Sequence, residues 1–236
     1  MLIYGRNPVL EAIREGQAGQ VWVARGVEGW LLKELDKLQA EYKLVPRIEL
    51  DQMVKTTQHQ GLVAELEEAT YSDPQAPLRL AQGRGEQPLL VVLDGVTDPR
   101  NYGAIIRSAF ALGAHGVVTE ERRSAPLSAI VLKASAGTAS KIPLVQVKNI
   151  ARYLEQIKEQ GLWVYGTSGR ASKTLEQLDY KRPLAVVIGS EGEGMRRLVG
   201  EHCDELARIA LAPGAESLNA AVALGVVLYQ AQLGRK

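Results

Sequence analysis

The sequence predicts an α/β protein in which a small α/β domain precedes a larger domain built on a parallel sheet. Two observations carry this prediction. The second part of the chain alternates apolar runs with helical patterns, and the runs lack the polar alternation of half-exposed strands. Residues 70–87 are rich in proline, glycine and glutamine, a composition typical of a linker. We therefore expect domains at 1–69 and 88–236, joined by a linker at 70–87.

The first 69 residues have the pattern of a compact α/β domain. A helix is expected near the start, capped by Asn7 with Pro8 in its first position. The stretches at 20–24 and 61–67 predict strands. Residues 30–42 have the apolar spacing of an amphipathic helix.

Six apolar runs after residue 87 predict the strands of the parallel sheet. Because such runs belong to strands covered on both faces, we expect helices on each side. One clear helical pattern lies at 149–160. The last predicted helix, at 217–232, is apolar nearly all round, so it needs cover from its own domain and from a partner subunit. The six runs are 88–94, 115–120, 142–147, 162–167, 184–190 and 206–211.

The composition excludes several classes of protein. The chain has 28 basic and 27 acidic residues, a formal net charge of +1, so any contact with nucleic acid must come from local patches. Cys203 is the one cysteine, which excludes an internal disulfide and a multi-cysteine zinc site, and we expect no metal. The N-terminus lacks the pattern of a signal peptide, and no stretch approaches the ~18 apolar residues of a membrane span. We expect a soluble, cytoplasmic protein.

Three polar clusters each follow a predicted strand, and the first is LDGVTDPRNYGAIIRSAFALG at 93–113. Asn101 lies near the expected helix start, and Arg107 lies about two turns further on. Taken alone, Asn101 is an ordinary N-cap and Arg107 a solvated surface residue. However, ligands of open parallel sheets bind beyond the carboxyl ends of the strands, which is where these side chains would lie.

The second cluster is the glycine-rich loop GSEGEGM at 189–195. Its order, G-x-x-G-x-G, is not the dinucleotide fingerprint, and it lacks the Gly-Lys-Ser/Thr ending of a nucleotide-triphosphate loop. Its two glutamates would also repel a phosphate. Glu193 is explained by a place in the first turn of the following helix, where its charge suits the helix dipole. Glu191 has no such structural explanation.

The third cluster is APGAESLNAAVALG at 212–225. Ser217 and Asn219 both suit a helix start, but capping explains only one of them. One of the two side chains is therefore available for another role.

Together the three clusters resemble, in order and spacing, the three motifs of the SpoU branch of the SPOUT RNA methyltransferases. LDGVTDPRNYGAIIRSA is similar to the first motif, VVIGSEGEGM to the second and ESLNAAVA to the third. The stretches EGMRRLVGEHCDEL, IYGRNPVLEA and HQGLVAEL resemble the members of the branch that methylate a guanosine 2′-hydroxyl in 23S ribosomal RNA. The likeness covers nearly the whole chain.

This resemblance implies a catalytic domain with a deep trefoil knot, in which S-adenosyl-L-methionine binds among the knot loops. Such knots are almost absent from other proteins. It also implies a homodimer formed through the catalytic domain. The N-terminal domain would be an RNA-binding domain that resembles a ribosomal protein.

The resemblance assigns roles to particular residues. Gly189, Ile209 and Leu218 would contact the cofactor mainly through their main chain, with Thr167 as a further contact. The mechanism proposed for this family would make Arg107 the general base, but a guanidinium keeps its proton in proteins. We therefore expect Arg107 to hold the target phosphate or the developing alkoxide, with Asn101, Ser217 and Asn219 orienting the ribose. Glu191 is expected to hold Asn101 or Arg107 through a charge-assisted hydrogen bond.

The resemblance points to a guanosine in the peptidyl-transferase P-loop hairpin of 23S rRNA as the substrate. Ribose methylation of tRNA, methylation of another rRNA site and a role as a non-catalytic RNA-binding assembly factor remain as alternatives. The first 69 residues hold eight basic and eleven acidic side chains, a net of −3, so RNA contact there would rely on a local face. The candidates on that domain are Arg6, Arg14, Arg25 and His59.

Overall fold

The computed structural model describes residues 2–14, 16–66 and 70–235. The chain folds as two units, divided between residues 69 and 70. None of the helices in the described part of the chain is long and apolar enough to cross a membrane.

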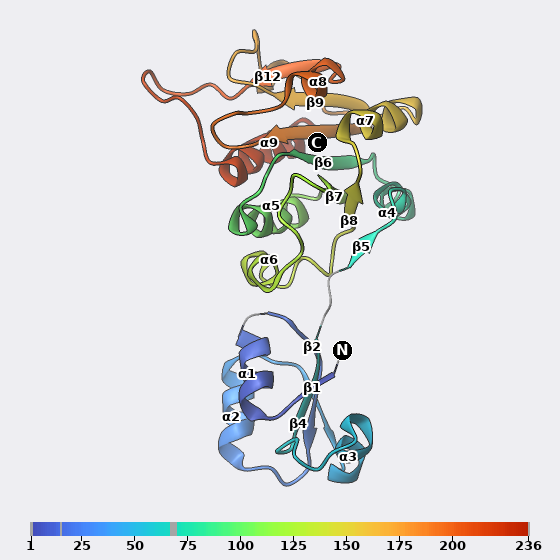
Figure 1. Ribbon diagram of the computed structural model, residues 1–236, viewed down its shortest axis with the longest axis vertical. Helices are drawn as coiled ribbons and strands as arrows, with labels where there is room; N and C mark the ends of the chain where they lie inside the picture. Colours follow the sequence, from blue (N-terminus) through green and yellow to red (C-terminus); the bar gives the residue numbers. More distant parts are fainter. Residues whose placement is uncertain (1, 15, 67–69, 236) are drawn as a thin grey trace. The chain divides into compact units, whose positions relative to one another are not determined.

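The N-terminal unit is a four-stranded sheet with helices on both faces (Figure 1). The strand order is β1-β4-β2-β3, with β4 antiparallel to both neighbours and β2 parallel to β3. Leu31 and Leu35 of α2 and Val9 of α1 pack on one face, whereas Leu50 of α3 packs on the other. The elements are β1 (Leu2–Tyr4), α1 (Arg6–Arg14), β2 (Ala18–Ala24), α2 (Gly29–Lys37), β3 (Tyr42–Val45), α3 (Arg47–Val54) and β4 (Leu62–Leu66).

Three details of this unit differ from the prediction. Helix α1 begins at Arg6, so that Pro8 is its third residue and Asn7 lies inside the helix. The helix predicted over 30–42 ends at Lys37, because Gln39 has a positive φ of 53° and the Ala40 N–H bonds back to the Leu35 carbonyl oxygen. Strand β3 begins at Tyr42, the last residue of the predicted helix, and α3 follows it as an element that the apolar pattern did not reveal.

The C-terminal unit is an eight-stranded sheet of order β10-β12-β9-β11-β6-β7-β8-β5, in which all pairs of described strands are parallel. The six predicted strands are present, and the parallel α/β fold is confirmed. The elements are β5 (Tyr71–Ser72), α4 (Ala76–Arg84), β6 (Leu89–Asp94), α5 (Pro99–Ala111), β7 (Gly116–Glu120), α6 (Ala129–Ser135), β8 (Leu144–Val147), α7 (Ile150–Glu159), β9 (Trp163–Thr167), β10 (Lys173–Thr174), η1 (Leu175–Gln177), β11 (Leu184–Gly189), α8 (Arg197–Glu201), β12 (Glu205–Arg208) and α9 (Ala220–Arg235).

Helices cover both faces of this sheet, as the continuous apolar strands predict (Figure 1). Helices α7 and α8 pack on one face around Leu90, Val92 and Val187. Helices α5 and α9 lie together on the other face, and α6 packs against α5. Gly103 of α5 permits this last contact, since a Cβ there would lie 2.6 Å from the Val131 carbonyl oxygen.

The segment 70–87 is not a linker, which corrects the prediction. It contributes β5, which pairs with β8, and the helix α4 to the C-terminal unit. The prolines suggested a linker, but Pro77 is the second residue of α4, a position where its missing N–H costs no helical hydrogen bond. Pro77 and Ala81 are buried on the sheet.

Candidate active site

The three polar clusters meet at the carboxyl edge of the eight-stranded sheet. Strand β6 leads into α5 and strand β11 into the glycine-rich loop, and these two strands are neighbours in parallel register, with Gly189 opposite Asp94. The start of α9 reaches the same place, because its first N–H, from Ala220, donates to Glu191 Oε1 at 3.1 Å. Residues more than 100 positions apart are therefore brought into one site.

Glu191 is the centre of the polar cluster in this site. Its Oε1 accepts hydrogen bonds from Asn101 Nδ2, at 3.1 Å, and from Asn219 Nδ2. Asn219 Nδ2 also lies 2.9 Å from Asn101 Oδ1, so that the three side chains form a closed triangle. The carboxylate sits at the electropositive start of α9, where its charge is stabilised. The predicted hydrogen bond between Glu191 and Asn101 is present.

Asn219 has two roles at once. Its Oδ1 accepts from the backbone N–H groups of Ala221, at 3.0 Å, and Val222, so it caps α9, while its Nδ2 binds Glu191. The last helix accordingly begins at Ala220 and not at 217. Asn101, by contrast, caps no helix, because Asp98 Oδ1 accepts the Arg100 N–H of α5 at 2.7 Å. Its side chain is free to serve the cluster.

The glycine-rich loop folds back on itself. Ser190 and Gly194 exchange backbone hydrogen bonds at 3.0 Å in both directions. A Cβ on Gly189 would lie 2.2 Å from the Gly194 carbonyl carbon, so this close approach itself requires glycine. Glu193 lies in this loop and not in the following helix, since α8 begins only at Arg197. The glycine pattern thus serves the turn that presents Glu191.

A buried ion-pair network, which was not predicted from the sequence, anchors the loop. Asp94, at the end of β6, is fully buried and accepts from Arg196 through the backbone N–H at 2.7 Å and through Nε at 2.6 Å. Arg196 Nη2 also lies 2.9 Å from Glu120 Oε2 at the end of β7, an ion pair without the alignment of a hydrogen bond. Burial opposes the charge of Arg196, but the Asp94 and Glu120 carboxylates outweigh it and raise the pKa of the guanidinium.

The remaining predicted catalytic residues are not bonded to this cluster. Arg107 lies in the third turn of α5 and is exposed, and none of the hydrogen bonds or ion pairs between described residues engages its guanidinium. Ser217 is exposed in the segment before α9. Their roles stay predictions.

The predicted cofactor contacts lie on neighbouring strand ends. Gly189 ends β11, Thr167 ends β9 and donates to the Val187 carbonyl oxygen at 3.2 Å, and Ile209 follows β12. From Ile209 to Leu218 the chain forms neither helix nor strand, and within this described segment one backbone bond joins two of its own residues, Ala215 N–H to the Ala212 oxygen. These main-chain groups fit a ligand bound through backbone contacts.

The four candidates for RNA contact in the N-terminal unit differ in availability. Arg6 pairs with Glu28 at 2.8 Å and stacks over Trp30, and Arg14 pairs with Glu34 at 2.7 Å. The side chain of Arg25 is exposed and has no ion pair among the described residues. Of the four, Arg25 is the exposed one without an ion pair among the described residues.

His59 requires a correction, because its side chain is completely buried. Its Nδ1 accepts from the Gly61 N–H at 3.0 Å, so its Nε2 donates to Asp51 at 2.8 Å. The two bonds hold the tight turn before β4, where Gln60 and Gly61 have positive φ. His59 is a structural residue and not a contact for RNA.

Comparison with known proteins agrees with this architecture. Residues 88–229 match the SpoU rRNA Methylase family, and residues 2–72 match the RNA 2′-O ribose methyltransferase substrate binding family. The chain is 42% identical over 233–240 residues to several curated relatives; one is the 23S rRNA (guanosine-2′-O-)-methyltransferase RlmB of Pseudomonas aeruginosa, with 97% of this chain and 94% of that protein aligned.

Solved structures show the same fold. The SpoU methyltransferase AviRb of Streptomyces viridochromogenes, crystallised in complex with the cofactor AdoMet, has a TM-score of 0.68 at 26% identity, covering 100% of this chain and 90% of that one. The AdoMet bound rRNA methyltransferase of Sinorhizobium meliloti has a TM-score of 0.65 at 25% identity, covering 98% and 86%. The chain therefore belongs to the SpoU family and is an RNA 2′-O-methyltransferase that uses S-adenosylmethionine.

Proposed function

We propose that this enzyme methylates the ribose 2′-hydroxyl of a guanosine in 23S rRNA, in the peptidyl-transferase P-loop hairpin. The observation that carries the proposal is the 42% identity to RlmB, which extends over 97% of the chain and so includes the N-terminal unit as well as the catalytic one. The substrate-binding family match at residues 2–72 supports a substrate larger than a single nucleotide.

In the proposed mechanism, the protein acts mainly by positioning. A ribose 2′-hydroxyl is a poor nucleophile at neutral pH, and holding it in line with the methyl group contributes on the order of 7 kcal/mol or more. Asn101 and Asn219, fixed by Glu191, orient the ribose together with Ser217. Removal of the hydroxyl proton at or before transfer adds roughly 10²- to 10⁴-fold.

Arg107 supplies the positive charge in this mechanism. Its guanidinium stays protonated, so it grips the target phosphate or stabilises the developing alkoxide and does not act as the base. Its exposure leaves the planar fork open for a bidentate contact with phosphate.

The cofactor supplies an activated methyl group on a sulfonium, and it carries no phosphate. Gly189, Ile209 and Leu218 would hold it through main-chain groups, with Thr167 at the end of the neighbouring strand. Glutamates in the loop are compatible with such a ligand, because its sulfur is cationic.

We further propose that the C-terminal segment is threaded as a deep trefoil knot and that the N-terminal unit resembles a ribosomal protein. A crystal structure with bound cofactor checks both.

A homodimer through the catalytic unit and a cytoplasmic location complete the proposal. Helix α9 leaves one apolar stripe exposed, at Val222, Val226, Tyr229 and Leu233, which are 53%, 39%, 56% and 47% exposed. Their spacing of four, three and four residues places them on one face of the helix. Replacing Tyr229 by Glu should convert a dimer to a monomer in analytical ultracentrifugation; an unchanged mass would exclude this face.

Mapping of 2′-O-methyl groups on the RNA of cells with and without the gene tests the proposed substrate. The expected result is the loss of one modification in the P-loop hairpin of 23S rRNA and its return when the gene is restored. Loss of a methyl group from tRNA or from another rRNA site would replace the proposed target. If no methyl group were lost from 23S rRNA, the proposed target would be wrong.

A further inference from the structure

Exposed basic side chains follow three neighbouring strands at the carboxyl edge of the large sheet. Strands β6, β7 and β8 are adjacent, and β11, which carries the glycine-rich loop, lies beside β6. Arg100 follows β6, and Arg122 and Arg123 follow β7. Lys148 and Arg152 follow β8. We call these five residues the basic edge.

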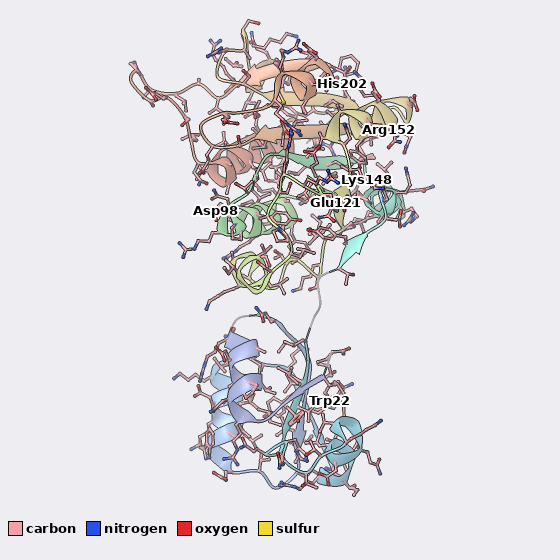
Figure 2. All side chains as sticks on the ribbon, viewed as in Figure 1. Trp22, Asp98, Glu121, Lys148, Arg152 and His202 are labelled. Atoms are coloured by element: carbon pink, nitrogen blue, oxygen red, sulfur yellow. The ribbon has the colours of Figure 1, made fainter. Side chains whose placement is uncertain are left out.

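Backbone hydrogen bonds tie the segments of the basic edge together. Glu120 and Val147 are paired residues of β7 and β8, and the Glu121 N–H donates to the Val147 carbonyl oxygen at 2.9 Å. On the other side, the Ala125 N–H donates to the Val96 oxygen of the loop after β6 at 3.0 Å. The loop of Arg122 and Arg123 is thus held between the other two segments. Figure 2 labels Glu121, Lys148 and Arg152 in this part of the unit.

The five charges are available to a ligand. All are exposed, and no ion pair or side-chain hydrogen bond with another described residue engages them. Other basic side chains of the unit are paired, for example Lys158 with Asp204 at 2.6 Å. Of the carboxylates nearby, Glu120 is held by Arg196 and the exposed Asp98 caps α5, whereas the exposed Glu121 has no side-chain hydrogen bond or ion pair with another described residue.

The positions of these charges also lower the stability of the fold. Arg100 and Arg152 lie in the first turns of α5 and α7, and neither first turn has an acidic residue. The helix dipole favours anions at this end, so cations there lower helix stability. Two adjacent arginines at 122 and 123 add mutual repulsion. A polyanion bound along the edge would turn this cost into attraction.

We propose that the basic edge binds the phosphate backbone of the RNA strand on one side of the nucleotide that is methylated. The proposal rests on the proposed function, because it takes RNA as the substrate. Arginine and lysine contacts to phosphates fix the register of a nucleic acid and read no sequence. The basic edge therefore supplies affinity and alignment, while selection of the target lies elsewhere.

Salt-dependent RNA binding by the full-length protein tests the proposal. The probes are a labelled transcript of the P-loop hairpin of 23S rRNA and an unrelated hairpin of equal length. In R122A/R123A, affinity for both probes should fall on the order of 10-fold, and the slope of log affinity against log salt should decrease by about 1.5. Cofactor affinity, measured by calorimetry, should not change, and R122K/R123K should keep most of the binding.

The matched control is R84A/K181A, which removes two exposed charges that precede β6 and β11 and so lie at the opposite edge of the same sheet. The control should leave binding unchanged. K148A/R152A provides a second variant on a separate segment, so that misfolding of one loop does not decide the outcome. If neither basic-edge variant weakens binding more than the control does, the proposal is wrong. If the mapping shows methylation at another site while the basic-edge variants still weaken RNA binding and reduce its salt dependence, only the proposed target is wrong.

Discussion

The two edges of the eight-stranded sheet use polar side chains in different ways. At the amino edge, Arg235 donates from Nη1 to the Gln87 carbonyl oxygen at 2.6 Å, and from Nη2 to the oxygens of Pro88 at 2.8 Å and Arg182 at 3.1 Å. His115 accepts there from the Leu89 N–H at 3.1 Å. Most of these bonds go to the backbone at the starts of β6 and β11, which they hold in place.

At the carboxyl edge, polar groups hold each other and the loops, and several keep bonding capacity for a ligand. Glu191 orients two amide side chains, and Arg107 is exposed without a partner among the described residues. The difference indicates that the amino edge contributes to stability, whereas the exposed groups of the carboxyl edge contribute to binding and turnover; the buried Asp94 network at the carboxyl edge contributes to both. Substitutions at the two edges should therefore separate in their effects.

The largest effect on turnover is expected from Arg107→Lys. Lysine keeps the charge but cannot reproduce the planar fork of the guanidinium, so kcat under saturating substrates should fall roughly 10²- to 10³-fold, about 2.7–4 kcal/mol. The free energy of unfolding should stay the same, because Arg107 is exposed. Near-normal kcat would contradict the bidentate clamp.

Asp94→Asn should damage both stability and the cofactor pocket. It leaves Arg196 with Glu120 alone and weakens the anchor of the glycine-rich loop. We expect the free energy of unfolding to fall by about 3 kcal/mol, together with a loss of cofactor affinity. Glu205→Gln, which removes the ion pair with Lys173 near the end of the sheet, is the control for a general loss of charge. Unchanged cofactor affinity in Asp94→Asn would show that the network is only structural.

Glu191→Gln should reduce turnover more than cofactor affinity. Glutamine keeps the shape of the side chain but loses the charge that orients Asn101 and Asn219. We expect kcat to fall roughly 10- to 100-fold, about 1.4–2.7 kcal/mol. Glu193→Gln, in the same exposed loop, should have near-normal kcat. Calorimetry that instead found cofactor binding lost would place Glu191 in the cofactor pocket.

Arg235→Met should give the opposite result, at the amino edge. Methionine retains much of the apolar stem but leaves three carbonyl oxygens without their donor, so the free energy of unfolding should fall by about 1.5 kcal/mol. Cofactor affinity and kcat at low temperature should match those of the unsubstituted enzyme. A selective loss of kcat would contradict the division between the two edges.

Much of the fold could be predicted from the sequence, because the hydrophobic pattern reports burial directly. Strand β6 is apolar up to its last residue, Asp94, β11 is apolar throughout, and both are fully buried. The pattern failed where local chemistry decides the structure. Proline inside α4 suggested a linker. The left-handed Gln39, which follows the end of α2, has no apolar signature.

The candidate site was only partly predictable for a similar reason. Asn101, Glu191 and Asn219 stood out because capping or turn chemistry did not account for all of them, and the structure joins them. Asp94 and Glu120 were missed, although each ends an apolar strand, where a buried carboxylate needs a cation. Their partner, Arg196, is about 100 residues distant from Asp94, and pairing at such a distance leaves no trace in local sequence.

The smallest effect is expected from pH, through His202, which lies away from the active-site cluster at the end of α8. Hydrogen bonding to the Leu198 carbonyl oxygen, at 2.7 Å, and the Glu155 carboxylate, at 2.9 Å, raise the pKa of His202 above 6.5. The folded state thus holds a proton more tightly than the unfolded state. This contribution is fully present below pH 6.5 and is lost as the pH rises through the raised pKa.

Comparison of His202→Gln with the unsubstituted protein by urea unfolding, across pH, measures this contribution. The difference in free energy of unfolding should be under about 1 kcal/mol at acidic pH, because the pair is near the surface, and should shrink as the pH rises. Buried His115 provides the opposite sign: burial lowers its pKa despite Glu86, so its contribution is lost as the pH falls below 6.5. A His202 difference that grows with pH would contradict the charged pairing with Glu155 and leave only the neutral hydrogen bond.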